Sequence, residues 1–344
     1  MEPGCYTALI TPFDQAGTLD SEGLEQLINF QIENAITGIL ATGTTGESPT
    51  LEWEEHNNII AQVARYAKNK CLTIAGTGSN NTQEALQATG LAARTGIDAV
   101  LLVDPYYNGP SSLEIRKEYH EVIARQYPDL SVIPYIIPGR VGAQMFPQDL
   151  AILAENCKNV SCVKEATGNL ENMKLTRKLC GPDFKILSGD DALVFAIMSD
   201  PDIMACGGIS VMSNIAPKFL SQMIELLNQG KTDEALKFQN KIKPLLDLVV
   251  VITQEDSKFG PVTCRARNPL PVKTLMQLLG MPSGPCRQPL GKMTRKGFKV
   301  LLDTAKHIQE NAPEIFQPIA DFFNVDIEKR LNDTTLHKNL WYSY

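Results

Sequence analysis

Eight strand-like runs that alternate with helical segments constrain the fold of this 344-residue chain more than any other feature. Short apolar runs favour strands, and apolar residues repeated at a period of 3.6 favour helices. Strands that alternate with helices are typical of a parallel sheet. The strand-like runs are residues 4–10, 38–42, 72–76, 99–103, 131–137, 160–164, 184–188 and 203–211, and the helical segments are residues 21–34, 50–67, 82–95, 112–127, 147–156, 170–179, 191–199 and 217–229.

The number and spacing of these units favour a closed barrel. Eight strand–helix units in roughly 225 residues match the usual size of a (β/α)₈ barrel. An open doubly wound sheet is the alternative, but it usually carries a Gly-x-Gly-x-x-Gly turn after its first strand. Here Ile10 leads into Thr11-Pro12-Phe13-Asp14, which contains no glycine. The sequence therefore predicts an α/β protein of the (β/α)₈, or TIM-barrel, class.

The alternation ends after Gly230, which predicts a barrel over residues 1–230 and a different organisation beyond it. Three helical segments, residues 232–251, 271–279 and 293–312, predict a C-terminal helical appendage over residues 231–312. The tail, residues 313–344, is too aromatic for a disordered segment. We expect it to dock on its own chain or on a neighbouring subunit. Its large side chains include Phe322, Phe323, Leu331, Trp341 and Tyr342.

Composition points to small-molecule partners rather than to nucleic acid or a membrane. The chain has 32 basic and 39 acidic residues, a net charge of −7 and no block of lysine or arginine. It shows no basic leader and no apolar stretch of membrane length, which predicts a cytoplasmic protein. Eight cysteines without Cys-x-x-Cys spacing and four well-separated histidines predict neither a disulfide framework nor a metal site.

Lys164 is the candidate catalytic nucleophile. It ends a strand-like run and precedes a polar turn, residues 165–169, so its amine could be half-desolvated and still reach a substrate. Burial lowers a lysine pKa from about 10.4 towards the ~7–8 that is useful for attack on a carbonyl. A strand-end lysine that points into solvent is the alternative. The polar residues found at the ends of the other predicted strands favour the interpretation of Lys164 as a nucleophile.

Residues that do chemistry in a (β/α)₈ barrel lie at the carboxyl ends of the strands. The turn at residues 43–48 follows the second strand, and its backbone N–H groups could hold a small carboxylate; Glu47 stands where a phosphate-binding loop needs a lysine. Hydroxyl groups could move protons during Schiff-base formation, and Arg140 could bind a second carboxylate. The rule selects Thr44, Thr45, Tyr107, Tyr135, Lys164 and Gly189.

Seven motifs, six of them in the predicted barrel and one beyond it, carry a family resemblance. They are residues 43–51 (Gly-Thr-Thr-Gly-Glu-Ser-Pro-Thr-Leu), 105–108 (Pro-Tyr-Tyr-Asn), 138–140 (Pro-Gly-Arg), 163–169 (Val-Lys-Glu-Ala-Thr-Gly-Asn), 188–191 (Ser-Gly-Asp-Asp), 208–211 (Gly-Ile-Ser-Val) and 268–273 (Asn-Pro-Leu-Pro-Val-Lys). In this order, and from about residue 4 to about residue 310, the chain resembles the dihydrodipicolinate synthase family. The combination of motifs is highly specific.

The resemblance implies a reaction and the residues that perform it. Pyruvate would form a Schiff base with Lys164, and the protonated imine would serve as the electron sink, so no metal or organic cofactor is implied. The derived enamine would add to L-aspartate 4-semialdehyde, and ring closure would give 4-hydroxy-tetrahydrodipicolinate on the diaminopimelate route to lysine. Tyr135 would be the acid and base. It would form a proton relay with Thr44 and with Tyr107, which a neighbouring subunit would contribute. The implied binding residues are Thr45 and Gly46 for the pyruvate carboxylate, Gly189 and Ile209 for its pocket, and Arg140 for the carboxylate of the aldehyde.

The resemblance also implies an allosteric site for L-lysine at a tight dimer interface, within a homodimer or a homotetramer. Glu84 would supply a carboxylate for an amino group, His56 a polar side chain, and Trp53 stands where some relatives have histidine. Ordinary polar residues at a dimer contact are the alternative. The residues that match this site are Ser48, Trp53, His56, Asn80, Glu84 and Tyr106.

The chain also departs from the family pattern. Ile136 replaces the usual asparagine and Val141 the usual threonine, and we expect both to make the substrate mouth less polar. Residues 199–202, an insert at residues 253–264 and the tail after Pro313 have no clear counterpart. These departures bear on the quaternary arrangement more than on the chemistry.

Two other functions fit parts of the same sequence. Another pyruvate-dependent aldolase, such as N-acetylneuraminate lyase or a keto-sugar-acid aldolase, would share Lys164 and Tyr135. The Thr44-Thr45 pair, together with Tyr107 and Arg140, favours the synthase over such a lyase. A non-catalytic barrel that binds a small metabolite is the alternative from a different class.

Overall fold

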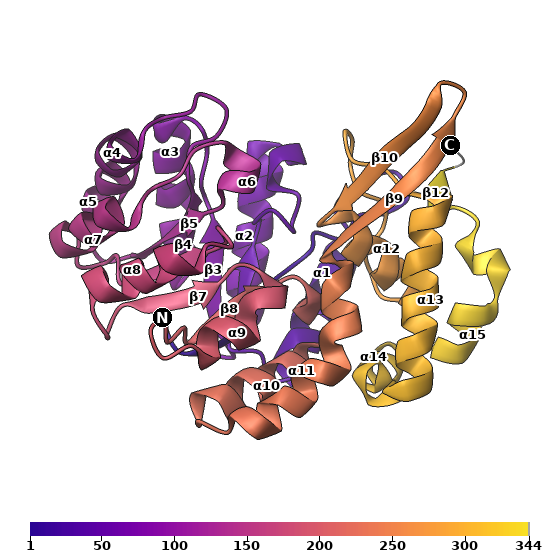
Figure 1. Cartoon of the computed structure of the whole chain (residues 1–344). Coiled ribbons are helices and arrows are strands. Elements are labelled where there is room, and N and C mark those ends of the chain that lie inside the picture. Colours follow the sequence, from indigo (N-terminus) through magenta and orange to yellow (C-terminus); the bar gives the residue numbers. More distant parts are fainter. Residues whose placement is uncertain (343–344) are drawn as a thin grey trace.

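The computed structural model describes residues 1–342 and contains a closed barrel of eight parallel strands in chain order (Figure 1). The first strand pairs with the second and also with the eighth, where Cys5 lies opposite Gly208. The predicted (β/α)₈ barrel is therefore confirmed, and an open sheet is excluded. The strands are β1 (Gly4–Ala8), β2 (Gly38–Ala41), β3 (Leu72–Gly76), β4 (Ala99–Val103), β5 (Ser131–Ile136), β6 (Cys162–Glu165), β7 (Lys185–Ser188) and β8 (Gly207–Ser210).

The contact that closes the barrel depends on a glycine. A Cβ atom at Gly207 would lie only 1.9 Å from the carbonyl oxygen of Gly4 on the neighbouring strand. Any side chain there would push β8 away from β1, because the obstacle is backbone rather than a flexible side chain. Gly207 is therefore part of the reason that the first and last strands can pair.

Side chains alternate along each strand between the barrel interior and the layer under the helices, because successive residues of a strand point to opposite faces. Tyr135 belongs to the interior cluster, and its neighbour Ile136 packs in the outer one. Val141 is also buried in the outer cluster. The expectation that Ile136 and Val141 make the substrate mouth less polar is therefore wrong. The interior cluster includes Tyr6, Leu40, Ile74, Leu101, Ile133, Tyr135, Leu187 and Ile209.

The helices that cover the barrel follow the predicted segments, with differences at some ends and with one short helix, α6, that was not predicted. The segment at residues 50–67 becomes regular helix only at Trp53, because Ser48–Thr50 forms a 3₁₀ turn that contains a proline. The segment at residues 112–127 is π-helical in its middle part, Ile115–His120. The helices are α1 (Ser21–Glu33), α2 (Trp53–Ala67), α3 (Thr82–Ala93), α4 (Ser112–Glu114), α5 (Glu121–Gln126), α6 (Pro138–Val141), α7 (Pro147–Asn156), α8 (Leu170–Cys180), α9 (Val194–Ser199) and α10 (Pro217–Asn228).

Beyond Gly230 the chain forms helices α11 (Thr232–Leu246), α12 (Leu270–Leu279) and α13 (Arg295–Asn311). The prediction that the first of these continues to residue 251 is wrong, because Val250 already begins a strand. The insert around residues 253–264 is an antiparallel hairpin made of β9 (Val250–Ser257) and β10 (Gly260–Arg267). The domain boundary at residue 230 stays a prediction.

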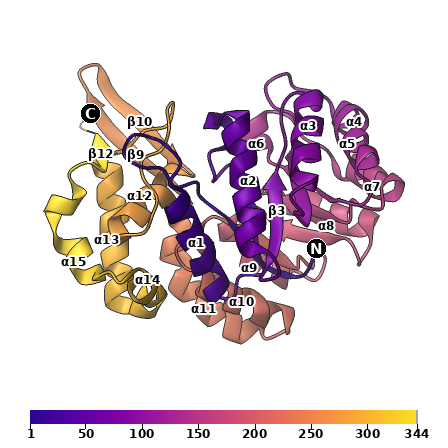
Figure 2. The same cartoon turned by 180° about the vertical axis from the view of Figure 1, so that it is seen from behind.

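The tail packs on its own chain, which was one of the two places where we expected it to dock. Helices α14 (Gln317–Phe323) and α15 (Ile327–Asn332) lie beside α13 (Figure 2). The short strand β12 (Trp341–Tyr342) pairs with β11 (Met293–Thr294). Phe322 and Phe323 pack on Phe30 of α1, with ring centroids 5.4 and 5.2 Å away. The tail thereby connects the C-terminal helices to the barrel layer.

Within residues 1–342, the model contains no helix that combines the length and the apolar character needed to cross a membrane.

Candidate active site and adjoining pocket

Lys164 lies on β6 with its side chain inside the barrel and only 4% exposed. Tyr135 is its partner in register on β5, and the Lys164 Nζ atom lies 4.1 Å from the centroid of the tyrosine ring. Burial lowers the pKa of Lys164 to about 7; the charge of Asp191 opposes this shift and that of Arg140 adds to it. A substantial share of the amine is therefore neutral and nucleophilic at neutral pH, unlike that of an ordinary lysine.

Asp191 is a charged neighbour of Lys164 that was not among the predicted site residues. Its carboxyl group is buried and accepts hydrogen bonds from the backbone N–H groups of Val211 (2.9 Å) and Met212 (3.0 Å). Burial raises the pKa of Asp191, and these hydrogen bonds oppose the rise. The motif at residues 188–191 was the available signal, but its spacing does not say which of its two aspartates faces the lysine.

Gly189 and Ile209 belong to the next two strand–loop units beyond Lys164. Gly189 directly follows β7, and a Cβ atom there would lie 2.9 Å from Ala166 Cβ and 3.1 Å from Lys164 Cε. Any side chain at this position would crowd the reactive amine. Ile209 is buried on β8 and belongs to the interior cluster. Both positions are therefore suited to lining a small pocket next to Lys164.

The structure brings Tyr135 and Thr44 together but leaves Tyr107 apart. Burial raises the pKa of Tyr135 to about 12; the charge of Arg140 and a side-chain hydrogen bond with Thr44 oppose this rise. A tyrosine with this pKa keeps its proton at neutral pH and can donate it. Tyr107 is 91% exposed, with a left-handed φ of 77°. Within one chain it does not reach the cavity that Tyr135 lines.

The turn after β2 is held by residues far away in the sequence. Thr45 is buried, and its hydroxyl oxygen accepts a hydrogen bond from Asn268 Nδ2 (3.0 Å). Glu47 adopts a left-handed φ of 58° and is buried against Lys273. Non-glycine residues in this conformation are strained and persist only where their surroundings hold them. Sequence reasoning used Glu47 only to exclude a phosphate loop and missed its partner.

Arg140 lies on the short helix α6 at the barrel mouth and is exposed. Its Nη2 atom donates a hydrogen bond to the carbonyl oxygen of Asn268 (3.0 Å). Asn268 is thus hydrogen-bonded both to Arg140, through its carbonyl oxygen, and to Thr45, through its side chain. The remaining guanidinium donors are available to a carboxylate.

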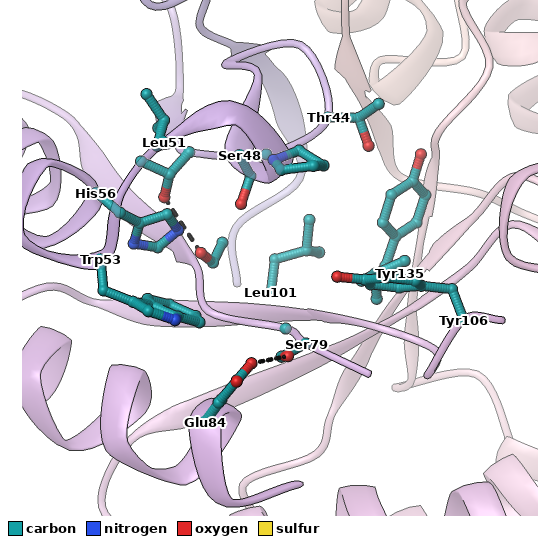
Figure 3. A pocket seen from close by; sticks show the side chains of 16 residues that line it. Thr44, Ser48, Leu51, Trp53, His56, Ser79, Glu84, Leu101, Tyr106 and Tyr135 are labelled. Carbon is teal, nitrogen blue, oxygen red and sulfur yellow. Dashed lines mark hydrogen bonds between the residues drawn. The ribbon is translucent and has the colours of Figure 1, made fainter. Parts of the chain in front are cut away.

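A cavity of about 230 Å³ connects the barrel mouth with the predicted lysine site. Thr44 and Tyr135 lie at one end, and Trp53, His56 and Glu84 lie at the other (Figure 3). Five of the six residues predicted for the lysine site line this cavity, whereas Asn80 is exposed and does not. The five are Ser48, Trp53, His56, Glu84 and Tyr106.

The far end of the cavity offers both a negative charge and a neutral acceptor. Glu84 accepts a hydrogen bond from Ser79 Oγ (2.6 Å), which fixes its carboxylate. Burial lowers the pKa of His56 to about 4, so its ring is neutral at pH 7. The Nδ1 atom of His56 is buried and has no hydrogen-bond partner among residues 1–342. Such a group can serve a ligand that carries N–H donors.

This fold and site define a class: (β/α)₈ barrel proteins with a partly neutral lysine at the mouth, able to form a Schiff base with a carbonyl compound. No cluster of three or more His, Cys, Asp or Glu residues suited to a metal occurs in the described part of the chain. The chain belongs to the dihydrodipicolinate synthetase family, whose model matches residues 2–308.

Individual relatives agree with this assignment. A 4-hydroxy-tetrahydrodipicolinate synthase of Methanococcus maripaludis (strain C7) is 38% identical over 305 residues, which cover 89% of this chain and 98% of the relative. One of Endomicrobium trichonymphae is 40% identical over 293 residues, covering 85% and 94%. The crystal structure of dihydrodipicolinate synthase from Aquifex aeolicus has a TM-score of 0.81 at 33% identity and covers 92% of this chain and 99% of its own. The structure from Cyanidioschyzon merolae with lysine bound has a TM-score of 0.81 at 36% identity and covers 89% and 98%.

Proposed function

We propose that this chain condenses pyruvate with L-aspartate 4-semialdehyde to give 4-hydroxy-tetrahydrodipicolinate. The observation that carries the proposal is the buried Lys164 amine, whose pKa is lowered to about 7, in register with Tyr135 at the mouth of the barrel. Family membership supports the choice of substrates, since relatives along nearly the whole chain are named as synthases of this product.

The chemistry begins with the neutral amine of Lys164, which adds to the keto carbon of pyruvate. The carbinolamine then loses water, which needs one proton delivered to its hydroxyl group; Tyr135 supplies it and Thr44 exchanges protons with Tyr135. Tyr135, which gave up its proton in the dehydration, takes a proton from the methyl group, and the imine becomes an enamine. The enamine carbon then bonds to the aldehyde carbon while the aldehyde C=O π bond breaks and its oxygen takes up a proton from Tyr135, which regenerates the imine. Attack by the amino group of the aldehyde substrate closes the ring and releases Lys164.

The carboxylates of the two substrates require separate positions. The turn that contains Thr45 and Gly46 is buried and rigidly held, which suits the carboxylate of pyruvate. Arg140 lies at the mouth, which suits the carboxylate of the incoming aldehyde. Gly189 and Ile209 leave space beside the amine for the small pyruvate methyl group.

Borohydride reduction in the presence of pyruvate tests the proposal directly. The reduced adduct is expected on Lys164 by mass spectrometry, and Lys164→Ala should lose both the adduct and at least ~100-fold of the activity with the two substrates. Lys185→Ala is the matched control, because Lys185 lies at the opposite end of a barrel strand. An unmodified Lys164 would favour the metabolite-binding barrel. Release of pyruvate from N-acetylneuraminate would favour the lyase.

We also propose that L-lysine binds at the far end of the cavity and inhibits the enzyme. Glu84 and the unpartnered Nδ1 atom of the neutral His56 are suited to an ammonium group. A family structure with lysine bound, from Cyanidioschyzon merolae, supports the idea. Unchanged activity at millimolar lysine would overturn it.

We further propose that the active unit is a homodimer or a homotetramer in which Tyr107 acts in the site of a neighbouring subunit. Its 91% exposure in the single chain supports this role. Mixing Lys164→Ala with Tyr107→Phe after joint refolding tests it. Activity should return in the hybrid, because one site then has both residues intact. Two inactive variants that stay inactive together would place Tyr107 in its own site or outside it.

A cytoplasmic location is part of the same proposal. All eight cysteines are free thiols, and four of them are buried, which suits a reducing compartment. Cell fractionation tests it, and recovery of the protein in a secreted fraction would contradict it.

A further inference from the structure

The β9–β10 hairpin is anchored to the C-terminal helices and rises beside the barrel mouth, with β10 on the side of α6 (Figure 1). One of its faces packs against α13, where Val251 and Glu255 are buried. Thr253 on this face lies 3.3 Å from Thr294, the residue that caps α13. The hairpin is therefore a fixed part of the fold, and its opposite face is the one available for other contacts.

Two arginines lie on that opposite face. Arg265 and Arg267 are two residues apart on β10, so their side chains leave the strand on the same side. Their cross-strand partners are Ile252 and Val250 of β9. Ile252 is 58% exposed, which confirms that this face is open.

The end of β10 and helix α6 exchange hydrogen bonds through two arginines. Arg140 donates to the carbonyl oxygen of Asn268, which follows Arg267, and Arg267 Nη2 donates to the carbonyl oxygen of Gly139, which precedes Arg140 (3.4 Å). This exchange places the hairpin arginines next to Arg140 at the substrate entrance. The pKa of Arg140 reflects the arrangement. Although the residue as a whole is exposed, its guanidinium group is partly enclosed, which lowers this pKa; the nearby Tyr135 opposes the shift, and the charges of Arg267 and Arg265 add to it.

This cluster of three guanidinium groups lacks a negative partner. Within residues 1–342, none of Arg140, Arg265 and Arg267 lies within ion-pair distance of a carboxylate, although other arginines such as Arg116 and Arg287 do. The Nε atom of Arg267 is buried and has no hydrogen-bond partner in the part of the chain that the structure describes. Like charges at close range repel each other, so an anion bound between these groups would relieve the repulsion and be attracted by all three. The buried Arg267 Nε–H group also lacks an acceptor among these residues, and a bound anion would supply one.

We propose that Arg265 and Arg267 of the hairpin complete, with Arg140, an anion subsite that binds the carboxylate of the incoming aldehyde. The inference rests on the proposed function, because it assigns these residues to the second substrate of that reaction. A planar guanidinium can hold a carboxylate through two parallel hydrogen bonds, and two or three such groups select strongly for an ionised acid. Arg265 and Arg267 of β10 are thus specificity-determining residues that the hairpin adds to the barrel mouth.

Conservative substitutions test the subsite. Arg267→Gln and Arg265→Gln should each lower kcat/KM for L-aspartate 4-semialdehyde about tenfold, because a hydrogen bond to a charged group is lost. The KM for pyruvate should not change. Lys258→Gln is the matched control, since it removes one positive charge from the exposed tip of the same hairpin; it should leave both parameters unchanged. The side chain of Arg265 makes no hydrogen bond among the described residues, so its variant keeps the test informative if Arg267→Gln folds poorly.

A second substrate separates a carboxylate contact from a general effect on the mouth. The carboxyl methyl ester of the aldehyde lacks the negative charge, so the wild-type enzyme should use it poorly and the two arginine variants should use it no worse than the wild type does. Rising salt should reduce kcat/KM for the free acid more in the wild type than in the variants. Equal loss with acid and ester, or no loss in either arginine variant, would overturn the inference.

Failure of the inference and failure of the proposed function give different results. Borohydride trapping of pyruvate depends on Lys164 alone, so an adduct should form equally in the wild type, both arginine variants and the control. An adduct without any effect of the arginines on the aldehyde step rejects the subsite and leaves the function standing. Absence of the adduct from the wild type rejects the function itself.

Discussion

The Oε1 atom of Glu47 lies 2.6 Å from the ammonium nitrogen of Lys273, although the two residues are 226 positions apart in the sequence. Both side chains are almost fully buried. Lys273 also donates to the carbonyl oxygens of Thr11 (2.9 Å) and Pro285 (3.1 Å), and Glu47 Oε2 accepts from the backbone N–H of Arg287 (2.8 Å). The ion pair therefore fastens the turn with Thr44 and Thr45 to helix α12.

Breaking this ion pair should destabilise the protein and disturb pyruvate binding together. In Lys273→Met the Glu47 carboxylate stays buried without its charged partner, which should cost about 3–5 kcal/mol of unfolding free energy in urea titrations. The double variant Glu47→Gln with Lys273→Met should recover part of the loss, because no unpaired charge remains. Lys243→Met is the control: it breaks an exposed pair with Asp247 and should barely change the midpoint. Equal losses of unfolding free energy in Lys273→Met and Lys243→Met would contradict a special role for the buried ion pair.

Imine formation should depend on pH with a midpoint near 7. The protonated Lys164 amine is not a nucleophile, and its pKa is lowered to about 7 by burial. The rate of borohydride trapping with pyruvate should rise from pH 5 to about 7 and level off above that, whereas an ordinary lysine would keep gaining rate past pH 9. Asp191→Asn removes a negative charge that favours the ammonium form, so the midpoint should move to lower pH. A midpoint that stays fixed or moves upward would show that Asp191 does not act on this amine.

Tyr135→Phe should impair proton transfer more than binding. The substitution keeps the ring beside Lys164 and removes only the hydroxyl group, so we expect kcat to fall by about 10²–10⁴-fold while pyruvate can still be trapped, slowly, on Lys164. Thr44→Val should give a smaller loss, since it acts on the substrate through Tyr135. Steady-state kinetics and quantitative mass spectrometry measure the two effects. Full retention of kcat in Tyr135→Phe would remove this tyrosine from the relay.

Glu84→Gln should weaken inhibition by lysine without loss of basal activity. The substitution keeps the size of the side chain and its contact with Ser79 but removes the negative charge, so the lysine concentration for half inhibition should rise about tenfold. Glu54→Gln, on the exposed side of α2, controls for a general effect of charge. Inhibition that is unchanged in Glu84→Gln would show that lysine, if it binds, uses another place.

The tail should contribute substantially to stability. Phe316 is fully buried, and Phe316→Ala should lower the unfolding free energy by about 3–5 kcal/mol. Leu336→Ala in the same tail removes a side chain that is 39% exposed and should cost far less. Thermal and chemical unfolding of the two variants compare them. Similar small effects would mean that the tail is only loosely attached in solution.

The barrel could be predicted because its signal is local and repeated. Each strand is a short apolar run, and a helix of clear period follows it, so eight weak assignments support one another. The hairpin lacked this support. Leu245, Leu246 and Leu248 continue the helical period of α11 towards Val250, and the following strands mix Asp256, Arg265 and several polar residues with the apolar ones. Local pattern therefore extended the helix where tertiary packing on α13 produces a strand.

The candidate site also contains residues that could be predicted from the sequence and residues that could not. Lys164 and Tyr135 could be selected because the barrel fold fixes which end of each strand faces the mouth. The ion pair of Glu47 with Lys273 and the hydrogen bond of Asn268 with Thr45 could not be predicted from the sequence. The first joins residues 226 positions apart and the second joins residues 223 positions apart. Ile136 was misplaced for a different reason: a shift of one residue along a strand moves a side chain from one face to the other.

The pairing of β1 with β8 has a consequence for biosynthesis of the molecule. The edge of β1 carries backbone groups that can pair with any free strand until residues 207–210 have left the ribosome. During that interval the nascent half-barrel is open to association with other chains. We expect chaperone dependence to be greatest for ribosome-bound fragments that end before Gly207 and to fall once the last strand can dock.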